Sequence, residues 1–82
     1  LANDEEYVRM RTLALYYVPK EGEQATRFEE GTYDNMAKAR RARRVVCGYG
    51  TEVALHVGTE HPDPLPFGEK LWREPNGFAD KH

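Results

Sequence analysis

The sequence predicts a small α+β domain in which one helix packs on a small, mainly antiparallel sheet, followed by an extended Pro-rich C-terminal segment. Residues 33–47 are rich in helix formers, and the runs 11–18 and 51–57 are rich in β-favouring residues. Three prolines between residues 62 and 66 then exclude any regular element. We therefore expect an N-terminal extension (1–10), a core in ββαβ order (11–58) and a C-terminal extension (59–82).

The first strand is expected over Arg11–Val18, where leucine, tyrosine and valine follow one another up to Pro19. A single helix over Asp4–Val18 competes with this strand. Asn3 and Glu6 resemble a capping box, and apolar residues continue after them at helical spacing. The alternation and the proline favour the strand, which is the interpretation adopted here.

A turn at residues 19–23 should reverse the chain, because Pro19 sets the entry and Gly22 tolerates a positive φ. The next run, 24–29, alternates weakly, with Phe28 as its inward residue. It is expected to be the return arm of a hairpin.

The helix is expected over Tyr33–Cys47. Thr32 or Asp34 can cap its start, and Gly48 can adopt the left-handed conformation that ends a helix. Its apolar side is built largely from small residues, such as Ala39 and Ala42, which favours close packing on strands. The opposite side carries four arginines: Arg40, Arg41, Arg43 and Arg44.

The clearest strand is expected over Thr51–Val57, with Val53, Leu55 and Val57 on one face. If the helix covers that face, the other face of the sheet is unusually apolar for a solvated surface. It should then be covered by the C-terminal segment or by another chain. Its residues would be Ala14, Tyr16, Val18, Ala54 and His56.

The C-terminal segment should run extended, near polyproline II, through residues 61–66. Phe67, Leu71 and Trp72 supply apolar anchors, and a short helical turn is expected over Glu69–Arg73. Pro75-Asn76-Gly77 is a turn signal, and residues 78–82 should fray.

No combination of residues points to catalysis, a metal or a cofactor. The sequence contains no serine, and its Cys and His residues show no ligand-pair spacing: Cys47, His56, His61 and His82. Cys47 lies near the predicted helix C-terminus, where the dipole disfavours a thiolate. We therefore expect no catalytic residue, no metal site and no enzyme activity.

The simplest interpretation of the helical arginines is a solvated charged face. They also suit an anionic partner, because a guanidinium group forms bidentate hydrogen bonds with phosphate or carboxylate. The net charge of −2 disfavours a dedicated nucleic-acid binder. We therefore expect a small accessory or regulatory protein that binds another protein or a second copy of itself, of a kind common in phages and mobile elements. The alternative is a nucleic-acid binder that uses Arg40, Arg41, Arg43 and Arg44, with Tyr16, Tyr49 or Trp72 stacking on bases.

Candidate interface residues are Tyr16, Val18, His56 and Trp72. No apolar run is long enough to cross a bilayer, the acidic N-terminus is unlike a secretion signal, and one cysteine cannot form an internal disulfide. A cytoplasmic protein without membrane contact is expected.

Overall fold

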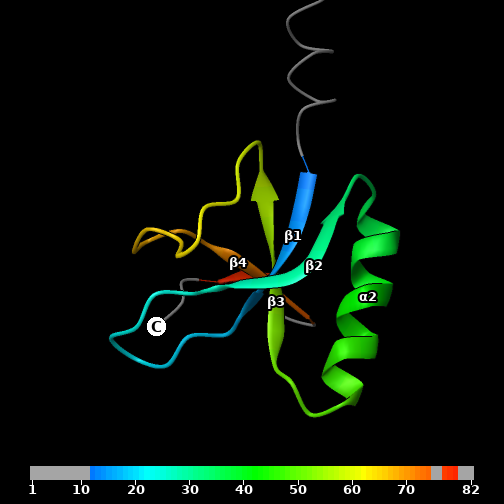
Figure 1. Ribbon diagram of the computed structural model, residues 1–82, viewed down its shortest axis with the longest axis horizontal. Helices are drawn as coiled ribbons and strands as arrows, with labels where there is room; N and C mark the ends of the chain where they lie inside the picture. Colours follow the sequence, from blue (N-terminus) through cyan, green and yellow to red (C-terminus); the bar gives the residue numbers. More distant parts are fainter. Residues whose placement is uncertain (1–11, 75–76, 80–82) are drawn as a thin grey trace, which may run out of the picture.

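A computed structural model describes residues 12–74 and 77–79. Within these residues, one helix packs on an antiparallel sheet of five strands (Figure 1), which confirms the predicted α+β class. The elements are β1 (Thr12–Tyr17), β2 (Arg27–Tyr33), α2 (Met36–Gly48), β3 (Val53–Gly58), β4 (Leu71–Arg73) and β5 (Gly77–Ala79).

The sheet has the order β2-β1-β3-β4-β5, so the two strands with the strongest β pattern lie in its centre. The β1–β3 pair is continuous from Thr12 opposite Gly58 to Tyr17 opposite Val53. The β1–β2 pair shifts register between Ala14 and Tyr16. Alternation along the central pair separates two faces, each of which needs a cover.

Helix α2 begins at a cap that differs from both predicted ones. Asn35, in extended conformation, accepts hydrogen bonds through Oδ1 from the backbone of Ala37 (2.7 Å) and Lys38 (3.3 Å). Asp34 instead forms a surface ion pair with Lys38. At the other end, the residue with positive φ is Gly50 (φ 89°) and not Gly48, which still belongs to the helix.

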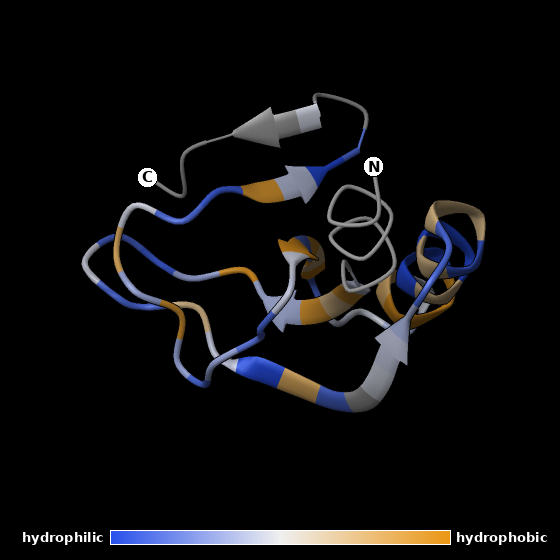
Figure 2. Cartoon of the chain, turned by 90° about the horizontal axis from the view of Figure 1, so that it is seen from above, coloured by the Kyte–Doolittle hydropathy of each residue, from blue (hydrophilic) through white to orange (hydrophobic). Residues whose placement is uncertain are grey.

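The helix covers the first face of the sheet, as expected. Ala39 is completely buried against Leu13, Leu15, Val53 and Leu55. The small side chain at position 39 allows the helix to lie close to the strands. Figure 2 shows the helix to one side of the sheet, with apolar segments on the central strands.

The second face is covered by the chain itself. Leu65 from the segment 59–70 and Ala25 from the β1–β2 connection are buried against Ala14, Tyr16 and Ala54. In Figure 1 these irregular segments lie on the opposite side of the strands from α2. Of the two predicted covers, the structure therefore shows the C-terminal one.

Two expectations about the C-terminal region were wrong. Residues 71–73 form strand β4, with Trp72 paired to Leu55, and not a helical turn over Glu69–Arg73. Residues 77–79 form strand β5 and so do not fray; residues 80–82 lie outside the described residues. Of the strand and the helix considered for the N-terminal part of the chain, the structure shows the strand, over residues 12–17. Residues 1–11 lie outside the described residues.

Candidate functional site

The four predicted arginines fall into two pairs. Arg40 Nε lies 3.2 Å from Glu74 Oε1, and its guanidinium lies 5.4 Å from the centre of the Trp72 ring. Arg43 Nη2 donates to the Glu74 carbonyl at 3.5 Å. These two side chains are half-buried and engaged with the β4 end of the fold, whereas Arg41 and Arg44 are exposed.

Arg41 contributes to an open, mainly apolar groove of about 470 Å³ between α2 and the edge strand β2. Two of its lining side chains are strongly exposed: Val45 at 54% and Tyr49 at 84%. Arg44 is not among the lining residues. The groove is lined by Phe28, Tyr33, Lys38, Arg41, Ala42, Val45, Val46 and Tyr49.

The edge of β2 gives the groove a second property. In the described part of the chain, β2 is the last strand of the sheet on this side, so its outer edge carries no neighbouring strand. Such an edge offers backbone donors and acceptors to an added strand. An apolar hollow, a cationic rim formed by Lys38 and Arg41, and an open strand edge therefore occur together.

The predicted interface residues do not form one surface. Tyr16 is fully buried and His56 is 5% exposed, both beneath the segment 59–70. Val18 packs on the same face, but Trp72 packs against the helix-side core. Their apolar or aromatic character reflects internal packing in this fold.

Beneath the segment 59–70, a polar cluster connects the sheet to its cover. His61 Nε2 lies 2.6 Å from Thr12 Oγ1, and His61 Nδ1 lies 2.9 Å from His56 Nδ1. His56 Nε2 in turn lies 3.2 Å from Glu69 Oε1. We call these four residues, Thr12, His61, His56 and Glu69, the histidine relay.

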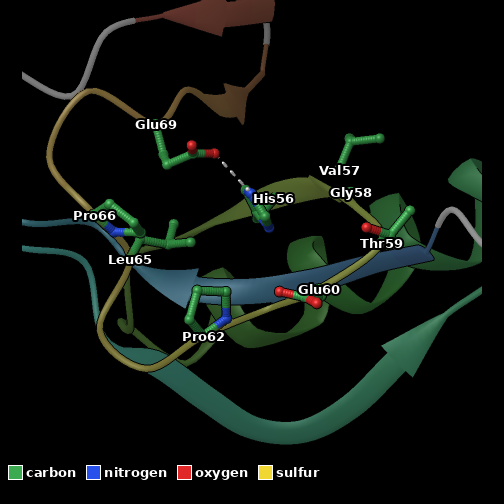
Figure 3. A pocket seen from close by; sticks show the side chains of 9 residues that line it. All are labelled: His56, Val57, Gly58, Thr59, Glu60, Pro62, Leu65, Pro66 and Glu69. Atoms are coloured by element: carbon green, nitrogen blue, oxygen red, sulfur yellow. Dashed lines mark hydrogen bonds and ion pairs between the residues drawn. The ribbon is translucent and has the colours of Figure 1, made fainter.

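The relay borders an open pocket of about 330 Å³. In Figure 3, His56 and Glu69 face each other in this pocket, and a dashed line marks their hydrogen bond. Burial, and then the neighbouring His56 and Arg27, lower the pKa of His61 to about 4. An imidazole with so low a pKa is a weak general base at neutral pH. The arrangement is therefore better suited to fixing the segment than to abstracting a proton.

Tyr16 fixes the same segment from below. Its hydroxyl donates to the Pro62 carbonyl at 2.6 Å. Burial is the main reason why the pKa of Tyr16 is raised to about 12. The neutral phenol is thus the form that the fold accommodates.

Within residues 12–74 and 77–79, no group of three or more His, Cys, Asp or Glu side chains is arranged to hold a metal ion. The Cys47 thiol is partly buried and contacts the Val53 carbonyl at 3.9 Å. None of the helices in this part of the chain has both the length and the apolar content needed to cross a membrane.

Of the groove residues, Arg41 and Tyr49 were among the predicted binding residues, whereas Lys38 and Val45 were missed although a signal for them was present. Lys38, Arg41, Val45 and Tyr49 recur every three or four residues and so form one stripe along α2 and its C-terminal cap. The contribution of β2 could not be found in this way, because Phe28 and Tyr33 reach the groove only through the tertiary fold.

Comparisons of this chain with protein-family models, with curated proteins and with solved structures each gave no match.

Proposed function

We propose that this protein is a small, non-catalytic accessory or regulatory protein that acts by binding another protein through the α2–β2 groove. The observation that carries the proposal is the combination of an exposed apolar hollow with a cationic rim beside an open strand edge. Exposed apolar surface beside a free edge is typical of sites that bind an extended peptide by strand addition.

The charge of the groove defines the partner segment. Lys38 and Arg41 border a hollow whose other lining side chains are uncharged. An extended segment that alternates apolar and acidic residues would place one set in the hollow and the other at the cations. Because Arg41 is exposed, it contributes mainly to orientation and association rate, while burial of Val45 and Tyr49 supplies affinity.

Nucleic acid is the second candidate, and one observation favours it. Tyr49, 84% exposed, lines the same groove as Arg41, so an aromatic platform lies near cations. Arg44 extends the exposed positive charge of the helix. Single-stranded nucleic acid would use these groups for stacking and phosphate contacts.

Binding of labelled probes separates the two candidates. The probes are an alternating Glu/Val/Phe peptide, its Lys-for-Glu counterpart, and mixed-sequence single-stranded DNA and RNA, each followed by fluorescence polarisation at two salt concentrations. Arg41→Glu changes a groove residue, and Arg44→Glu makes the same charge change on the same helix outside the groove. Tyr49→Ala removes the exposed aromatic ring.

The proposal predicts micromolar binding of the acidic peptide only. Arg41→Glu and Tyr49→Ala should each weaken it about tenfold, or about 1.4 kcal/mol, and Arg44→Glu less than about threefold. Strongly salt-dependent DNA or RNA binding, weakened alike by both arginine changes, would favour the nucleic-acid function instead. Binding of neither class would reject both. Self-association that Tyr49→Ala abolishes would identify a second copy as the occupant.

We further propose that the protein works in the cytoplasm. The reason is that Cys47 is a free thiol, which a reducing compartment preserves.

A further inference from the structure

We propose that the histidine relay is an acid-sensitive clasp, which holds the segment 59–70 over the second face of the sheet and releases it when His61 gains a proton. This inference goes beyond the proposed binding function. It concerns the face of the sheet opposite the α2–β2 groove and rests on separate contacts.

With Glu69 ionised and both rings neutral, one set of donors and acceptors accounts for every contact of the relay. An ionised Glu69 can only accept, so His56 Nε2 donates to it and His56 Nδ1 must accept. His61 Nδ1 therefore donates to His56 Nδ1, and His61 Nε2 accepts from the Thr12 hydroxyl. Both imidazoles are neutral in this arrangement, and each of their nitrogen atoms is satisfied.

A proton added to His61 weakens this arrangement. A proton on His61 Nε2 makes that nitrogen a donor to Thr12 Oγ1, so the Thr12 hydroxyl must donate to the more distant Gly58 carbonyl at 3.4 Å, and a cation is enclosed near Arg27. The contact between the two rings has room for one proton only, because two N–H groups cannot face each other across 2.9 Å. Once the segment leaves the sheet, water can solvate the His61 cation.

The charged groups around the clasp do not offset this effect at His61. Glu69 contacts His56 and not His61, and Asp63 accepts a hydrogen bond from the Arg27 backbone. Arg27 on β2 opposes protonation of His61, as does His56 on β3. Tyr16 on β1 stays neutral, and Glu60 is exposed to solvent.

The sign of the pH dependence follows from these groups. The pKa of His61 is lowered in the closed state, so the open state binds the proton more tightly. The stability of the closed segment is complete above about pH 6.5, the ordinary imidazole pKa, and declines as the pH falls towards about 4. Release would expose Ala14, Tyr16 and Ala54, the apolar face that Leu65 otherwise covers.

Amide hydrogen exchange measured by NMR tests the clasp directly. The Leu65 amide reports the segment because it donates to the Ala25 carbonyl at 2.9 Å, and amides of the central β1–β3 pair report the sheet. With pKa values of about 6.5 open and about 4 closed, the protection factor of Leu65 should fall about thirtyfold between about pH 7.5 and about pH 5. Protection in the central pair should change less than about threefold.

Two variants and one titration complete the test. His61→Gln should make the protection of Leu65 nearly independent of pH, whereas Glu60→Gln, at an exposed carboxyl of the same segment, should retain the wild-type change. If His61→Gln opens the segment at every pH, the wild-type protein still provides a test. In it, NMR measures the pH midpoint of the His61 ring signals. A His61 midpoint near 6.5, or Leu65 protection that does not change with pH, would overturn the clasp.

Discussion

The two faces of the sheet are covered by different means. Helix α2 satisfies its own backbone internally and adheres to the first face through apolar side chains such as Ala39 and Val46. The segment 59–70 has no such internal ladder, and it is tied down by individual hydrogen bonds. These include Tyr16 Oη to the Pro62 carbonyl, Gln24 Nε2 to the Leu65 carbonyl and the histidine relay. An irregular cover therefore depends on polar partners placed on the surface beneath it.

The largest effect in this comparison is expected from Leu55→Ala. Leu55 is completely buried on the face of β3 that the helix covers. Close-packed regular elements there cannot collapse around a cavity. We expect a loss of about 3 kcal/mol in the free energy of unfolding, measured by urea denaturation. Val45→Ala, at an exposed position of the helix, is the matched control and should change stability by less than about 0.5 kcal/mol.

Leu65→Ala should have a smaller and more local effect, of about 2 kcal/mol at most. Leu65 is equally inaccessible at 2% exposure, but an irregular segment can settle into the space that is left. Hydrogen exchange should accelerate within residues 59–70 and remain slow in β1 and β3. A loss equal to that of Leu55→Ala, spread over the whole sheet, would show that the two covers do not differ in this respect.

The same contrast explains what the sequence could predict about the fold. Periodicity indicated the helix, the central strands and the faces that they bury, because a regular element repeats its contacts along the chain. The roles of Leu65, His61 and Glu69 follow no period: each meets the sheet through a contact between residues far apart in the sequence. Strand β4 was mistaken for a helical turn because three residues are too few to show alternation.

Charge and aromatic content identified candidate site residues without indicating how the fold uses them. Arg40 and Arg43 were grouped with Arg41 and Arg44 in the prediction. In the structure, Glu74 at the end of β4 contacts Arg40 and Arg43. Tyr16 and His56 were expected at an interface, and the structure uses both to hold the internal cover. The groove itself depends on the placement of β2 beside the helix, which no local pattern encodes.

Tyr16→Phe gives the smallest effect and the sharpest test of the polar cover. The change removes the hydrogen bond to the Pro62 carbonyl and keeps the ring, so the free energy of unfolding at about pH 8 should fall by about 1 kcal/mol. Because the pKa of Tyr16 is raised to about 12 in the fold, the wild-type protein loses stability as the pH rises above about 10, the ordinary tyrosine value. Phenylalanine cannot ionise, so the difference between the two proteins should vanish between about pH 10.5 and about pH 11, because the wild-type loss passes about 1 kcal/mol in that range and reaches about 1.4 kcal/mol at about pH 11. Urea denaturation at about pH 8 and about pH 11 measures this convergence, and the absence of any difference at about pH 8 would mean that Tyr16 holds the segment through its ring alone.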